Sequence, residues 1–168
     1  MSLSGVEMMK KALIFVAVVF ELFLFSACKA EEKSTLNFEG FSKTVSFFED
    51  GTELCGNFEY RSADDMSFVF QKPESLKGIK LQKNKAEWDI GFDEIRCRLE
   101  NPEKVLNTRK GFETLFEVFA ACTEENPPQK QTKTRYKGVY AFGEAVFSVD
   151  ENGEITALRA GEYDYKFT

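Results

Sequence analysis

The sequence predicts a mainly β domain (α+β class): a strongly curved antiparallel sheet, or incomplete β-barrel, with one mid-chain helix as its lid or plug. Apolar and polar residues alternate with a period of two over most of 41–167, and turn signals separate the alternating runs. The period becomes helical only over 102–123. A helix is ~10–12 Å across and strands lie ~4.8 Å apart, so one helix cannot cover about nine strands of a flat sheet. Either the sheet curls around the helix or apolar surface stays open, and a half-barrel combines both.

The first part of the domain predicts a meander of about five or six antiparallel strands. Its first strand, Phe41–Glu49, leads into Asp50-Gly51, a strong two-residue hairpin signal. Pro73 ends a later strand because proline cannot donate to the ladder. The residues expected on apolar strand faces are Leu54, Gly56, Phe58 and Tyr60; Met66, Phe68 and Phe70; Ile79 and Leu81; Ala86, Trp88 and Ile90; and Ile95, Cys97 and Leu99.

The helix is expected to begin at Asn101-Pro102, which fit an N-cap and a first helical residue. It ends before Asn126-Pro127-Pro128, since prolines cannot continue a helix. Its apolar stripe consists of Phe112, Leu115, Phe116, Phe119 and Cys122. A linker at 129–134 follows. The last strands place on their apolar faces Tyr136, Gly138, Tyr140 and Phe142; Ala145, Phe147 and Val149; Ile155–Leu158 after the Asn152-Gly153 turn; and Tyr163, Tyr165 and Phe167.

Residues 1–27 have the form of a bacterial lipoprotein signal peptide. Lys10-Lys11 precedes a mostly apolar run at 12–27 that is short for a membrane span. Residues 24–28 (LFSAC) resemble a lipobox, in which Cys28 is acylated and becomes the mature N-terminus. An ordinary cleaved signal and an uncleaved anchor are the alternatives.

The domain boundaries follow from this signal. Residues 1–7 precede a natural-looking start at Met8 and are an upstream start or a cloning remnant. Residues 28–40 form the lipid anchor and a polar tether, and 41–168 form the β domain. The protein is therefore expected to be exported and lipid-anchored in the cell membrane or the outer membrane, where the several acyl chains of a lipoprotein give stable attachment.

Composition excludes several functional classes. The chain has 168 residues and no histidine, which removes histidine bases, serine–histidine–aspartate triads and imidazole-ligated zinc or haem. A net charge of -6 argues against a nucleic-acid partner. The cysteines Cys55, Cys97 and Cys122 match no zinc-ligand spacing. We therefore expect no catalytic residue, no metal site and no cofactor, and no enzyme activity.

A disulfide is the one cysteine pairing to consider in the exported domain. Cys97 and Cys122 both fall on expected apolar faces, whereas Cys55 falls on the polar face of its strand. Cys97–Cys122 is thus the candidate bridge in an oxidising compartment. The alternative is that all these thiols are reduced, because three cysteines do not make a disulfide framework.

Several segments together resemble the LolA/LolB lipoprotein-carrier superfamily. They are Gly56–Tyr60 (GNFEY), Met66–Gln71 running into the Pro73, Leu76 and Gly78 segment, the mid-chain helix and the hairpin at Asn152-Gly153. The resemblance implies an incomplete antiparallel barrel that cups a hydrophobic cavity for an acyl chain or an unfolded peptide. The implied cavity residues are Phe58, Tyr60, Phe68, Phe70, Trp88, Tyr140, Phe142 and Phe147, and the implied lid residues are Phe112, Leu115, Phe116 and Phe119.

Two functions of different classes therefore remain open. The first is a membrane-tethered, non-catalytic protein that binds or carries an acyl chain, a lipoprotein or an apolar peptide. The second is a sensor or scaffold module of the cell envelope that docks a partner protein on the open sheet. Core packing is the plainer explanation for any single aromatic residue, since large aromatics dominate protein cores.

Overall fold

The computed structural model describes residues 36, 38, 40–100, 110–123 and 125–168. The chain divides into two units, 1–33 and 34–168, and everything described belongs to the second. The predicted signal peptide, Cys28, most of the tether and the predicted helix start at Asn101-Pro102 lie outside the described residues. Within the described residues no helix is long and apolar enough to cross a membrane.

The described elements are eleven strands, one α-helix and one 3-10 turn. In chain order they are β1 (Phe41–Glu49), β2 (Thr52–Ser62), β3 (Asp65–Lys72), η1 (Glu74–Leu76), β4 (Ile79–Asn84), β5 (Glu87–Phe92), β6 (Ile95–Arg98), α3 (Lys110–Ala121), β7 (Gln129–Thr132), β8 (Arg135–Tyr140), β9 (Gly143–Val149), β10 (Ile155–Ala160) and β11 (Tyr163–Phe167).

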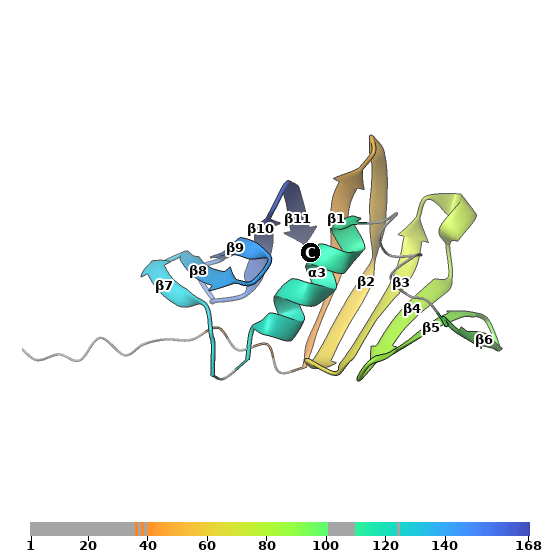
Figure 1. The fold of residues 1–168 in the computed structure, drawn as a ribbon. Helices are drawn as coiled ribbons and strands as arrows, with labels where there is room; N and C mark the ends of the chain where they lie inside the picture. The colour runs from red at the N-terminus through yellow and green to blue at the C-terminus, as the bar shows by residue number, and fades with distance from the viewer. Residues whose placement is uncertain (1–35, 37, 39, 101–109, 124) are drawn as a thin grey trace, which may run out of the picture. The chain divides into compact units, whose positions relative to one another are not determined.

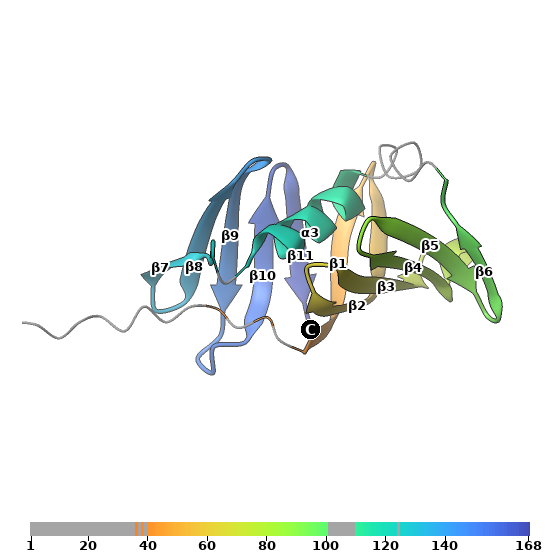
Figure 2. The ribbon, with the colours of Figure 1, turned by 60° about the horizontal axis from the view of Figure 1, so that its bottom comes forward.

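All strands belong to one antiparallel sheet of the order β6-β5-β4-β3-β2-β1-β11-β10-β9-β8-β7. Two meanders are joined where β1 pairs with β11, the first strand of the sheet with its last. No pairing joins β6 to β7 among the described strands, so the sheet is open. It curves around α3, which lies across its concave face (Figures 1 and 2). The predicted fold class, a curved antiparallel sheet with one mid-chain helix, is confirmed.

The prediction that segment 129–134 is a linker is wrong, because most of this segment is a strand. Residues Gln129–Thr132 form β7, which pairs with β8 at the sheet edge. Every residue of β7 is exposed, so none of its side chains had to be apolar. An exposed polar edge strand carries no alternation for sequence reading to detect.

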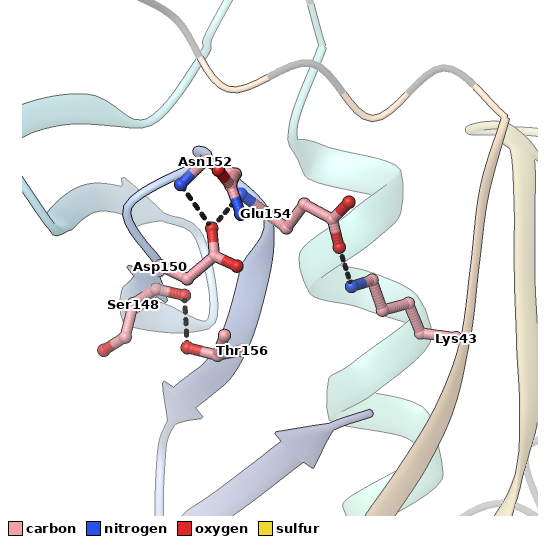
Figure 3. Close-up of polar contacts among 6 residues, drawn as sticks. All are labelled: Lys43, Ser148, Asp150, Asn152, Glu154 and Thr156. Atoms are coloured by element: carbon pink, nitrogen blue, oxygen red, sulfur yellow. Dashed lines mark hydrogen bonds and ion pairs between the residues drawn. The ribbon is translucent and has the colours of Figure 1, made fainter.

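The predicted turn at Asn152-Gly153 is present and is held by Asp150. The Asp150 Oδ1 atom accepts the backbone N–H groups of Asn152 and Glu154, both at 2.9 Å (Figure 3). These hydrogen bonds, that of Glu154 above all, lower the pKa of the Asp150 carboxyl. Glu154 also forms an ion pair with Lys43 of β1, so the β9–β10 turn is tied to the strand at the centre of the sheet (Figure 3).

Candidate ligand-binding groove

The helix α3 occupies the concave face of the sheet by packing aromatic rings against it. Its buried stripe includes the predicted lid residues Phe112, Leu115, Phe116 and Phe119. The ring centroids of Phe119 and Phe58 are 4.8 Å apart, and those of Phe112 and Phe68 are also 4.8 Å apart. These edge-to-face contacts have the geometry that aromatic pairs prefer. The helix is therefore packed into the sheet as a plug.

Most of the predicted cavity residues belong to this packed layer. Their side chains are buried in the core cluster that includes α3; they are Phe58, Tyr60, Phe68, Phe70, Tyr140 and Phe147. Phe147, for example, contacts Phe119 with centroids 6.1 Å apart. In this structure these residues belong to the hydrophobic core, which agrees with core packing as the explanation for aromatic residues.

The other two predicted cavity residues, Trp88 and Phe142, lie at an open groove beside α3. The groove has a volume of about 790 Å³. Its walls are the β4–β5 hairpin, one flank of α3 and the β8–β9 turn, which contribute Lys83, Ala86, Trp88, Glu113, Phe116, Glu117, Ala120, Ala121, Ala141 and Phe142. The groove thus lies where the helix stops covering the sheet.

The Trp88 wall is set by strand register. Trp88 is opposite Lys83 in the β4–β5 pair, so both side chains are on the concave face. The indole lies against Phe116, with ring centroids 4.9 Å apart. Trp88 is half-buried and lines the groove. One face of the groove is therefore aromatic.

The opposite wall is fixed by a hydrogen bond at the end of the helix. The Cys122 Sγ and Tyr140 Oη atoms are 3.0 Å apart, and either can donate. Tyr140 in turn stacks on Phe142 with centroids 5.3 Å apart. Gly138 makes room for this arrangement, because a Cβ there would lie 2.3 Å from Tyr140 Oη. The β8–β9 turn is thereby held against the C-terminal end of α3.

The groove carries charges of both signs. Glu113 and Glu117 are one turn apart on α3, and Lys83 faces them from β4. Burial raises the pKa of the Glu117 carboxyl, the neighbouring Glu113 raises it further, and Lys83 partly opposes them. The Lys83 ammonium group donates to the backbone oxygen of Ala63 at 3.2 Å, in the β2–β3 turn.

Of the two alternatives for the cysteines, a Cys97–Cys122 bridge or three reduced thiols, the structure has the second. Cys55, Cys97 and Cys122 are free thiols in this structure, and the Cys97–Cys122 bridge is not formed. Cys97 was assigned to an apolar face, but all residues of β6 are exposed because α3 does not extend over that edge. Cys122 is buried, and burial raises the pKa of its thiol to about 12.

Sequence reasoning missed the polar and small residues of the groove. Glu113 and Glu117 flank the aromatic stripe of α3 at a spacing of four, which marks the edge of the buried face. Ala120 and Ala121 follow the stripe and leave space that larger residues would fill. This pattern of glutamates and alanines beside the stripe could have indicated the groove. Nothing in the sequence distinguishes Lys83, because it is one of several lysines in its hairpin.

Comparisons with known proteins find likeness in structure and none in sequence. No family model matches the chain, and no curated protein matches it. The fold is similar to the crystal structure of a LolA superfamily protein from Nitrosomonas europaea, with a TM-score of 0.42 and 9% identity over 80% of this chain and 86% of the other.

Proposed function

We propose that this chain is a non-catalytic, lipid-anchored protein of the bacterial cell envelope that binds the apolar part of a ligand in the groove beside α3. The observation that carries the proposal is the groove itself. Its volume of about 790 Å³ falls within the range of roughly 300–1,000 Å³ for small-molecule sites. Its walls combine three aromatic side chains, Trp88, Phe116 and Phe142, with a few polar groups, as such sites do.

The physical basis of the binding is burial of apolar surface. An acyl chain or an apolar peptide side chain that enters the groove leaves water and contacts the rings of Trp88 and Phe142. No bond is made or broken, so the function is sequestration or transfer of the ligand. The packed core under α3 holds the groove walls in place before the ligand arrives, which lowers the entropic cost of binding.

Binding can be measured through Trp88, because the chain contains one tryptophan. The full chain, kept in solution with an amphipol, is titrated with a single-chain lipid while the Trp88 emission is recorded. A saturable blue shift is expected. The variant Ala120→Phe fills the groove and should abolish the shift. Its matched control is Ala157→Phe, which enlarges another half-buried alanine on β10, outside the groove.

Native mass spectrometry of the same preparations adds a second readout. A lipid that co-purifies with the parent chain and is absent from Ala120→Phe would support the proposal. Binding that is unchanged in Ala120→Phe would place the ligand elsewhere, and failure of every apolar ligand to bind would overturn the proposal.

The anchor is tested separately at Cys28. Metabolic labelling with palmitate is expected to mark the parent chain and to be lost in Cys28→Ala. Globomycin, which blocks lipoprotein signal cleavage, should leave residues 1–27 attached. Labelling that survives the Cys28→Ala change would contradict acylation at this cysteine.

A second candidate function, docking of another envelope protein, is supported by the β5–β6 hairpin. Phe92 and Ile95 are opposite each other in the register, and they are 56% and 67% exposed. Large apolar side chains exposed side by side mark interaction surfaces. A photo-crosslinking residue at Ile95 should trap a defined partner in cells, whereas one at the equally exposed Val139 should not.

A further inference from the structure

We propose that the ligand of the groove is an amphiphile whose polar end carries a positive charge, such as a protonated amine. This inference rests on the proposed function and adds the chemical class of the head group. Three features of the groove favour a cation: two carboxylates, the faces of its aromatic rings and the C-terminal end of α3.

The carboxylates of Glu113 and Glu117 both line the groove. Within the described part of the chain, neither lies within ion-pair distance of a lysine or arginine. Glu113 raises the energy of the charged form of Glu117, because like charges four residues apart on a helix repel. A cation between them would relieve that repulsion.

Lys83 does not supply this cation by direct contact. Its ammonium group donates a hydrogen bond to the carbonyl of Ala63, at 3.2 Å, and therefore points to the β2–β3 turn. It partly offsets the acidic field at Glu117 but forms no ion pair there within the described residues. Among the described charged side chains that line the groove, two are acidic and one is basic. An anionic head group would therefore meet net repulsion.

The end of the helix adds to the negative potential. The groove runs along α3 to Ala120 and Ala121, at its C-terminus. The C-terminal end of a helix carries about half a negative charge, which cations stabilise. The last turn of α3 contains no basic residue that would serve this purpose.

The aromatic walls suit a cation as well as an alkyl chain. Cations are attracted to the faces of aromatic rings, most strongly to tryptophan. Trp88 stands on one side of the groove and Phe142 on the other, with Phe116 between them from α3. A ligand would place its amine between Glu117 and the indole, toward the C-terminal turn of α3, and its alkyl chain along Phe142.

The test compares head groups on one alkyl chain. Octylamine, octanol and octanoate are titrated into the full chain in amphipol at neutral pH, and Trp88 emission reports occupancy. Octylamine should bind more tightly than octanol, by up to about fivefold, the effect of one partly exposed ion pair. Octanoate should bind more weakly than octanol.

The double variant Glu113→Gln/Glu117→Gln should reduce this preference to less than about twofold while octanol binding is kept. Its control, Glu94→Gln/Glu151→Gln, changes the net charge equally at exposed turns outside the groove and should leave the preference intact. Circular dichroism checks that each variant is folded.

The outcomes separate the two proposals. Three results would overturn the cationic head group and leave the proposed function standing. They are octanol binding without any preference for octylamine, tighter binding of octanoate than of octanol, and a preference for octylamine that survives in Glu113→Gln/Glu117→Gln. Absence of binding for all three compounds would overturn both.

Discussion

Gly111 of α3 lies so close to Phe47 of β1 that a Cβ atom on the glycine would stand 2.5 Å from the Cε2 atom of the ring. The same residue is held through both its backbone groups. Its N–H donates to Glu49 Oε1 at 2.8 Å, and its carbonyl accepts the hydroxyl of Tyr165 at 2.6 Å. The start of α3 is thus fixed on the sheet at one glycine, and the position of the groove along the helix depends on it.

The first prediction concerns Gly111→Ala. Alanine is favoured over glycine in a helix by about 1 kcal/mol, so local propensity alone would make this variant more stable. The contact with Phe47 reverses the sign, because an added methyl group in a packed core costs about 1–3 kcal/mol. Urea unfolding should show a lower free energy of unfolding for Gly111→Ala.

A double variant isolates the cause. Phe47→Leu removes the ring, so Gly111→Ala should cost less in the Phe47→Leu background than in the parent chain. Equal costs in both backgrounds would mean that the ring is not responsible.

The second prediction concerns Glu49, which is 4% exposed and faces the helix. Glu49→Leu removes the acceptor of the Gly111 N–H group, and leaving a buried donor unsatisfied costs about 1–3 kcal/mol. Glu49→Gln keeps a side-chain oxygen and should be destabilised less. Unfolding free energies rank the variants, and hydrogen exchange at the Gly111 amide should accelerate most in Glu49→Leu. Equal stability of the two variants would contradict this role.

The alternation of aromatic residues was enough to predict the concave face and the strands that contribute to it, but not the polar edge strand β7. Phe58, Phe68 and Phe147 lie on that face and are fully buried, as their spacing indicated. The alternation does not predict which part of the concave face is covered by α3. Trp88 and Phe142 have the same pattern as the buried aromatics, yet they border the groove because they lie beyond the flank of the helix.

The same limit explains why Cys97 is exposed. Its position in β6 gave the correct face of the sheet, since it is opposite Ile90 in the register. Burial of that face depends on the width of the sheet relative to α3, which is a tertiary property. A residue on the concave face is therefore buried near β1 and exposed at β6.

The third prediction ranks the thiols by reactivity. Cys97 is exposed, Cys55 is half-buried with a pKa raised by burial, and Cys122 is buried beside Tyr140. The thiolate is the reactive form, so iodoacetamide at pH 8 should alkylate Cys97 first, Cys55 more slowly and Cys122 only in urea. Peptide mass spectrometry measures each site. A Cys97–Cys122 peptide in a non-reducing digest would instead show that the bridge predicted from the sequence can form.

The fourth prediction is a loss of stability at alkaline pH that depends on Cys122. Burial raises the pKa of its thiol from 9.0 to about 12, so the folded state disfavours the thiolate that the unfolded chain forms readily. The stabilisation is therefore fully present below pH 9 and is lost as the pH rises from 9 to about 12, at up to ~1.4 kcal/mol per pH unit for this group. Burial also raises the pKa values of Tyr140 and Tyr165 above their ordinary value of 10.0, so these tyrosines add to the loss as the pH rises above about 10.

Cys122→Val separates the thiol from the tyrosines. This variant keeps an apolar side chain but cannot ionise, so its free energy of unfolding should fall less steeply between pH 9 and 11 than that of the parent chain. Cys97→Val is the matched control, because Cys97 is exposed, and it should retain the parent slope. Urea unfolding at a series of pH values measures the slopes. If Cys122→Val and the parent chain lose stability in parallel, the alkaline loss arises elsewhere than in the contact between Cys122 and Tyr140.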